Sequence, residues 1–147
     1  MKKDLILLFG LIVCFKALAI GQGFNLHINV TGLHSNKGQV ILYLYNSETG
    51  FPKDHKKAYK MAVSRIQNNT CILDLDNIPS GTYAVAFFHD ENNNGIIDTN
   101  FLGLPTEGVG SSDNGTSSFG PPKFSGSKFD VKSNLSMILK TKYFFSR

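Results

Sequence analysis

Residues 79–110 hold the stretch that most constrains how this chain folds. The turn-forming residues Pro79, Ser80 and Gly81 directly precede an apolar run over residues 82–88, TYAVAFF. Proline presets the backbone for a turn and glycine accepts a positive φ, so the chain should reverse direction just before this run. A short run that is apolar at both odd and even positions is typical of a strand covered on both faces. We therefore expect a central β-strand here.

The rest of the chain is patterned for short strands. Residues 24–31 alternate strictly between apolar and polar side chains, as in a strand that is buried on one face. Asn68 and Asn69 are expected to form a tight hairpin turn, because asparagine tolerates positive φ. About seven strands separated by turns, with no longer repeat, predict an all-β fold, a single antiparallel β-sandwich. The further strands are expected over residues 39–46, 61–67, 70–75, 127–131 and 135–145.

One long connection interrupts this pattern. Residues 90–126 are rich in glycine and contain Pro105, Pro121 and Pro122. The usual connection in a compact domain is only about four to six residues long. Long irregular connections of this kind are commonly functional, so we expect a site in this segment.

The N-terminal segment has the composition of a secretory signal. Lys2 and Lys3 give a positively charged start, an apolar stretch follows over residues 5–15, and residues 17–19 form an A-x-A cleavage site. This stretch is shorter than the roughly 20 residues that a membrane-spanning helix needs. Residues 1–19 are therefore predicted to be a cleaved signal peptide.

Removing this segment leaves a β-sandwich domain over residues 20–147, exported to the periplasm or the extracellular space. A lipoprotein anchored through Cys14 is disfavoured, because the bulky Val13 stands where a small residue is required. The chain has 15 Lys and Arg and 11 Asp and Glu, a net charge of +4; the signal removes three Lys and one Asp, leaving 12 and 10, or +2. Such a near-neutral domain gives no reason to expect nucleic-acid binding. Cys71 is left without a disulfide partner and is expected in the core.

The acidic segment after the central strand resembles a calcium-binding loop. It follows the pattern D-x-[DN]-x-[DN]-G, in which oxygen atoms at alternate positions surround the ion and the glycine allows a sharp bend, here at Gly95. Two carboxylates and two amides would give weak binding, in the range of about 10⁻⁴ to 10⁻³ M. The candidate calcium ligands are Asp90, Asn92, Asn94, the backbone carbonyl of Ile96, and Asp98.

The segment departs from an EF-hand at its twelfth position. Phe101 stands where a bidentate glutamate is required, and no helix pattern flanks the loop. Glu107 could complete the ligand shell if the chain folds back on itself. The alternative is a metal-free turn in which the Asp and Asn side chains bond their own backbone. Calcium is the one cofactor that the sequence predicts.

Two other functions remain open. A small hydrolase could use His89 and Asp90 together with Asp98 or Glu107, although the sequence holds no nucleophile motif. A protein-interaction domain could instead use the loop over residues 99–126. That alternative requires its aromatic rings to face solvent, namely those of Phe101, Phe119 and Phe124.

The residues of the central segment resemble a known bacterial family. The motif LxxIPSGTYAVAxxHDxNxNGxxDTNxxGxPxEG over residues 75–108, together with GPPxF over residues 120–124, is similar to the uncharacterised family called domain of unknown function 2141. The resemblance covers residues 24–142. It implies an exported bacterial protein with a transthyretin-like or immunoglobulin-like β-sandwich, and it implies no established activity.

These observations lead to one expected function. The chain should be an exported, non-enzymatic β-sandwich with a binding or envelope role, a protein or carbohydrate ligand, no membrane span and a candidate calcium site at residues 90–98.

Overall fold

The computed structural model describes residues 23–114 and 120–145. The predicted signal peptide and Phe119 lie outside these residues. The described chain forms eight strands with one short 3-10 helix, η1, and one short α-helix, α1. In chain order the elements are β1 (Phe24–Thr31), β2 (Gln39–Tyr45), η1 (His55–Lys57), β3 (Lys60–Arg65), β4 (Cys71–Ile78), β5 (Gly81–Asp90), β6 (Val109–Ser111), α1 (Phe124–Ser127), β7 (Phe129–Val131) and β8 (Leu135–Lys140).

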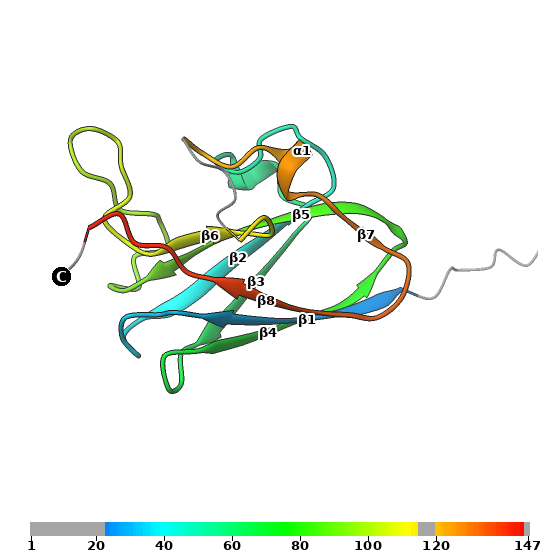
Figure 1. Cartoon of the computed structure of the whole chain (residues 1–147), viewed down its shortest axis with the longest axis horizontal. Coiled ribbons are helices and arrows are strands. Elements are labelled where there is room, and N and C mark those ends of the chain that lie inside the picture. Colours follow the sequence, from blue (N-terminus) through cyan, green and yellow to red (C-terminus); the bar gives the residue numbers. More distant parts are fainter. Residues whose placement is uncertain (1–22, 115–119, 146–147) are drawn as a thin grey trace, which may run out of the picture.

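The strands form two sheets that pack face to face. One sheet has the order β4-β1-β8, and the other has the order β3-β2-β5-β6, with β7 pairing the start of β5. Figure 1 shows the first sheet below the second, with α1 on the far side of the second sheet. The all-β sandwich predicted from the sequence is confirmed, with eight strands where about seven were expected.

The alternating strands bury one side in the space between the sheets. In β1 the apolar side chains of Leu26, Ile28 and Val30 are buried, while those of Asn25 and His27 are exposed. The inner core also takes Cys71, as predicted, together with apolar side chains from β2, β4 and β5. This contact between the sheets is the main source of stabilisation, because apolar burial contributes about 25 cal/mol for each Å².

The central strand β5 is covered on both faces, which explains its uniformly apolar sequence. Residues Tyr83 to Asp90 are all buried. The outer face of this sheet carries a second apolar cluster that includes Tyr45 and Phe88, and the segment around η1 and the helix α1 cover it with Phe51 and Phe124. This covering positions the end of β5, and the acidic loop begins there.

Two features of the topology differ from the prediction. The strands over residues 127–131 and 135–145 were expected to form a closing hairpin, yet β7 pairs with β5 and β8 pairs with β1 in the other sheet. The β1–β8 pair is parallel, so the sandwich is not wholly antiparallel. A connection of three residues separates β7 from β8, and the chain crosses between the sheets there instead of turning back. The turn at Asn68 and Asn69 is confirmed, with φ of 51° and 55°.

Candidate functional site

The acidic loop joins the end of β5 to the start of β6 and returns almost to its own starting point. The backbone N–H of His89 donates to the carbonyl of Gly108 at 2.8 Å. Within the loop, the N–H of Thr106 donates to the carbonyl of Asp98 at 2.9 Å. Residues 91–107 therefore form a closed loop held at its neck. In Figure 1 this loop projects beyond the sheets at one end of the molecule.

Asp90 organises the first bend of the loop from a buried position. One carboxylate oxygen accepts the N–H of Asn94 at 3.0 Å, and the other accepts the N–H of Gly95 at 3.0 Å. The second oxygen also accepts the side-chain amide of Gln39 at 2.9 Å. Gly95 has a φ of +78°, which confirms the predicted sharp bend. Asp90 therefore stabilises the turn through its own backbone neighbours.

Asn92, Asn94 and Asp98 converge on the outer side of the same bend. The side-chain amides of Asn92 and Asn94 donate to the two carboxylate oxygens of Asp98, at 2.7 and 3.0 Å. The Asn92 side-chain oxygen accepts the N–H of Asn94, and the Asn94 oxygen accepts the N–H of Ile96. Each of these side chains thus has a partner within the loop.

Glu107 fastens the two ends of the acidic loop together. Its side chain is 2% exposed, and its carboxylate oxygens accept the N–H groups of Glu91 at 2.9 Å and Asp98 at 3.0 Å. Burial raises the pKa of the Glu107 carboxyl, the nearby charges of Asp98 and Asp90 raise it further, and the two backbone donors lower it. We call this pair of hydrogen bonds the Glu107 clasp. The loop folds back on itself at Glu107, which is the condition under which Glu107 could complete a calcium ligand shell.

These hydrogen bonds are the kind that the self-bonded turn, the alternative to a calcium loop, would make, and the calcium site stays a prediction. The side-chain oxygens of the predicted ligands accept hydrogen bonds from loop donors. Over residues 23–114 and 120–145, no group of three or more His, Cys, Asp or Glu side chains is placed to hold a metal ion. Ile96, whose carbonyl was a predicted ligand, lies at the exposed outer part of the loop.

The outermost part of the loop presents bare apolar side chains. Phe101 is 95% exposed, Leu102 is 68% exposed and Ile96 is 63% exposed. We call residues 99–105 the tip; it is closed by a bridge between Thr99 and Pro105. The interaction-loop alternative required an exposed Phe101, and this ring is exposed. The sequence analysis did not identify Ile96, Leu102 and Leu104 as surface residues, because nothing in an apolar pattern distinguishes a buried leucine from an exposed one.

His89 is fully buried and occupied on both ring nitrogens. Its Nδ1 lies 2.7 Å from the Tyr143 hydroxyl, and its Nε2 lies 2.7 Å from the carbonyl oxygen of Lys37. A carbonyl only accepts, so Nε2 carries a proton, and in the neutral imidazole Nδ1 accepts from the Tyr143 hydroxyl. The imidazole thus connects β5 to the C-terminal segment and to the turn before β2. It makes no hydrogen bond to Asp90, Asp98 or Glu107, the proposed hydrolase partners.

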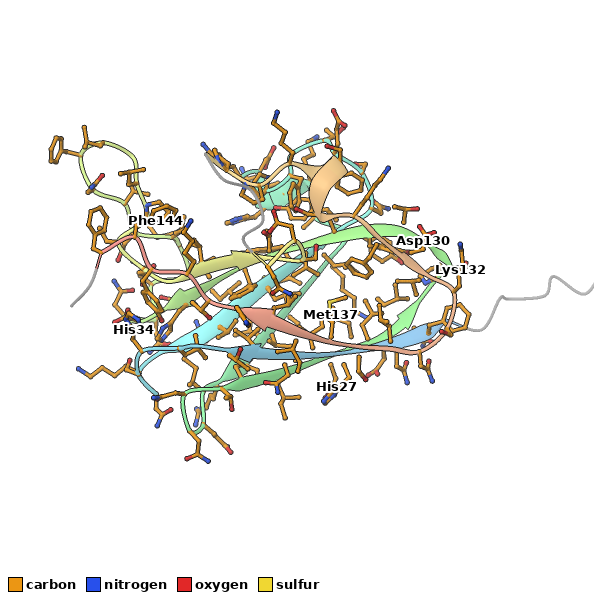
Figure 2. The ribbon with its side chains drawn as sticks, in the orientation of Figure 1. His27, His34, Asp130, Lys132, Met137 and Phe144 are labelled. Carbon is orange, nitrogen blue, oxygen red and sulfur yellow. The ribbon has the colours of Figure 1, made fainter. Side chains whose placement is uncertain are left out.

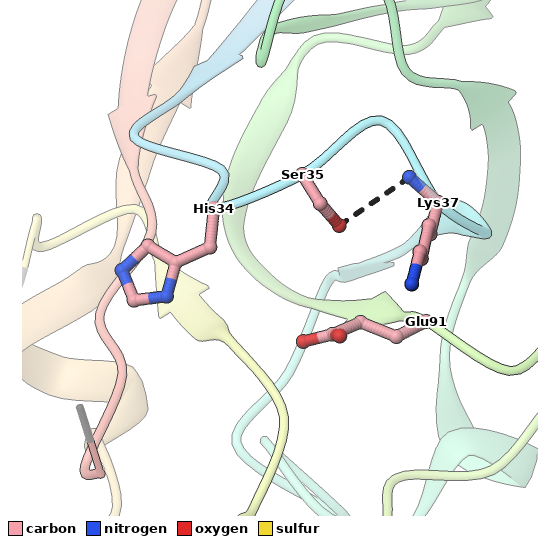
Figure 3. A pocket seen from close by; sticks show the side chains of 4 residues that line it. All are labelled: His34, Ser35, Lys37 and Glu91. Carbon is pink, nitrogen blue, oxygen red and sulfur yellow. Dashed lines mark hydrogen bonds between the residues drawn. The ribbon is translucent and has the colours of Figure 1, made fainter. Parts of the chain in front are cut away.

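A pocket of about 360 Å³ lies beside the start of the acidic loop. Figure 3 shows its lining side chains, His34, Ser35, Lys37 and Glu91. The His34 ring stacks on Tyr143 with ring centroids 3.5 Å apart, and Ser35 accepts the backbone N–H of Lys37. His89 is not among the lining residues. The residues that line this pocket are of polar or charged types, and no sequence motif marked them.

A second pocket, of about 620 Å³, lies between the segment before η1 and the segment that leads into α1. Phe51 and Phe124 line it and pack edge to face with centroids 5.9 Å apart. Phe124 is half-buried in this contact, so it does not present the free ring that the interaction-loop alternative required. Among the rings named for that alternative, Phe101 remains exposed.

Comparison with known proteins gives a family for the chain. No helix among the described residues has the length and apolar character needed to cross a membrane. No curated protein matches the sequence, and no solved structure matches it. A family model described as "Uncharacterized protein conserved in bacteria (DUF2141)" matches residues 28–138, from β1 into β8 and through the acidic loop. The chain therefore belongs to this family of uncharacterised bacterial proteins, in agreement with the resemblance seen in the sequence.

Proposed function

We propose that this protein is an exported, non-enzymatic binding module of the bacterial envelope, and that the tip of the acidic loop is its binding surface. The observation that carries the proposal is the exposure of Phe101, at 95%, on a loop that is closed by internal hydrogen bonds. The basic and apolar N-terminal segment, with its A-x-A site, supports export.

A fixed apolar projection favours binding for two physical reasons. Exposing a phenylalanine and a leucine together forgoes about 1.5–3 kcal/mol of burial for each side chain. A surface that is already ordered loses little conformational entropy when a partner covers it, which increases affinity. The Glu107 clasp and the hydrogen bonds from Asn94 and Gly95 to the Asp90 carboxylate supply that order, because they fix both ends of the loop.

The same hydrogen bonds support a non-enzymatic role. A general base or acid must reach a proton on the substrate, either directly or through one water molecule. His89 is fully buried, and Glu107 is 2% exposed with both oxygens accepting backbone N–H groups. Both residues act on their own chain in this geometry.

Binding to isolated bacterial envelopes tests the proposed surface. The double variant Phe101→Ser, Leu102→Ser should bind at least tenfold more weakly than the unaltered protein, a loss of about 1.4 kcal/mol or more. The matched control is Met61→Ser with Ile138→Ser, which removes exposed apolar side chains from β3 and β8. Equal binding by the tip variant and the unaltered protein would refute the proposed surface.

Calcium binding is a second candidate, favoured by the oxygen-bearing side chains that lie within one bend of the loop. Asn92 and Asn94 both donate to the Asp98 carboxylate, and the backbone N–H of Asn94 donates to the Asp90 carboxylate. Carboxylate and amide oxygens are the ligand types that calcium prefers. Binding would require Asn92 and Asn94 to turn their side-chain oxygens toward the ion.

We expect about 5 mM calcium to raise the Tm by about 3–5 °C, because a site with a Kd of about 0.5 mM contributes about 1.4 kcal/mol at that concentration. The variant Asp98→Asn should lose most of this rise, and magnesium at equal concentration controls for ionic strength. An unchanged Tm, or an equal rise in Asp98→Asn, would rule out the site.

A further inference from the structure

The tip carries no charged side chain. Residues 99–106 read TNFLGLPT, and the apolar side chains of Phe101, Leu102 and Leu104 are exposed. Exposed apolar residues that occur singly on a surface need no explanation, whereas a contiguous group indicates an interaction site. The tip is also convex, because it projects beyond the sheets in Figure 1.

Four backbone N–H groups of the tip donate to acceptors within the tip. Asn100 is the centre of this arrangement: its side-chain oxygen accepts the N–H groups of Leu102 at 2.9 Å and Leu104 at 3.1 Å. The N–H of Gly103 donates to the Asn100 carbonyl at 2.9 Å, and the N–H of Asn100 donates to the Leu104 carbonyl at 2.9 Å. Pro105 has no N–H to satisfy. These four N–H groups are therefore satisfied without water or a polar partner.

The C-terminal segment adds aromatic side chains at the same end of the molecule. The N–H of Lys142 donates to the carbonyl of Val109, immediately after the loop. Phe144 and Phe145 follow and are partly exposed, and the Lys142 ammonium lies 5.3 Å from the centre of the Phe144 ring. Figure 2 labels Phe144 beside the base of the projecting loop. Segments that lie at the boundary between water and lipid combine apolar side chains such as phenylalanine and leucine with lysine side chains that reach back toward water.

We propose that the tip inserts into the interface of a phospholipid bilayer, with Phe101 and Leu102 entering first and Phe144 following. This inference rests on the proposed function and names its partner. Backbone N–H groups carried into lipid lose their water, so a lipid-inserting loop gains from satisfying them internally, as the Asn100 side chain does for Leu102 and Leu104. A protein pocket would supply its own acceptors, so it would not require this arrangement. Attraction to anionic lipid is not needed, because the tip carries no charge.

Tryptophan fluorescence tests the insertion, because the chain contains no tryptophan of its own. The variant Phe101→Trp places one fluorophore at the tip, and Ile138→Trp places one at an exposed position on β8 as the matched control. The probes are vesicles of phosphatidylcholine, and vesicles of phosphatidylethanolamine with phosphatidylglycerol. We expect a blue shift with both vesicle types for Phe101→Trp, quenching by bromine-labelled lipid, little dependence on salt, and no shift for Ile138→Trp.

Vesicle flotation of unlabelled protein gives the size of the effect. Phe101→Asp with Leu102→Asp should lower the partition coefficient by about a hundredfold, because both anchoring side chains are lost. No shift with either vesicle type would overturn the lipid inference; if envelope binding still depended on the tip, the proposed function would survive with a protein partner. A shift without vesicles that grows with protein concentration would identify a second copy of the chain as the occupant. Equal shifts for both Trp variants would indicate unspecific adsorption and would also overturn the inference.

Discussion

Replacing Glu107 with alanine is expected to lower the free energy of unfolding by about 3 kcal/mol, since removing a buried charged acceptor costs about 1–3 kcal/mol for each donor left unpaired. The N–H groups of Glu91 and Asp98 would both lose their partner. Urea denaturation of the full chain measures the change. Glu48→Ala, which removes an exposed glutamate, is the control and should stay within about 0.5 kcal/mol of the unaltered protein.

The variant Glu107→Gln distinguishes the contribution of the hydrogen bonds at this position from that of the negative charge. Glutamine keeps the side-chain volume and one acceptor, so its loss should be smaller than that of alanine. Folding raises the pKa of the Glu107 carboxyl above 4.5. Between pH 4.5 and this higher pKa, the folded state therefore binds more protons than the unfolded state does. The stability of the unaltered protein, relative to Glu107→Gln, should therefore fall as the pH rises from about 4.5 through the folded pKa. A difference that rises over this range would contradict the assignment.

Gly38→Ala is expected to destabilise the protein by about 3 kcal/mol or more. Gly38 has a φ of +72°, and a Cβ at this position would overlap the carbonyl group of Asp90. The substitution thus combines a strained backbone with a steric clash, each costing about 1–3 kcal/mol. The Gly38→Ala substitution would also displace Asp90, at which the acidic loop begins. Urea denaturation again gives the change in free energy.

Gly95→Ala is the matched control for this prediction. Gly95 also has a positive φ, of +78°, but apart from Gly95 itself and its two chain neighbours no residue has an atom within 4 Å of the position that its Cβ would take. It should therefore cost only the conformational penalty of about 1 kcal/mol. If the two variants were equally destabilised, close contact between the turn at Gly38 and the end of β5 would be refuted.

The local structure followed from the sequence, because it depends on neighbouring residues. The alternation over residues 24–31 gave the bounds of β1 correctly, and the uniformly apolar run identified β5 as a strand covered on both faces. The bend at Gly95 was predicted from the known requirement for positive φ. These features are determined by side-chain period and backbone sterics, which are visible in a short window.

The pairing of distant segments did not follow from the sequence. The patterns of β7 and β8 fit a hairpin equally well, and only the packed sandwich shows that β8 adds in parallel to β1. The exposure of Leu102 and the burial of Glu107 likewise depend on where the loop folds back. The sequence identified the oxygen-bearing residues of the loop, but their choice of partners depends on three-dimensional geometry.

Crosslinking from the tip in living cells tests the central proposal most directly. The full chain would carry a photoreactive amino acid at position 101, or at position 138 as the control, and would be expressed in bacteria with its own N-terminal segment. The proposal predicts covalent adducts from position 101 in the envelope fraction and few from position 138, which is also exposed. Equal yields from the two positions, or none from position 101, would contradict it.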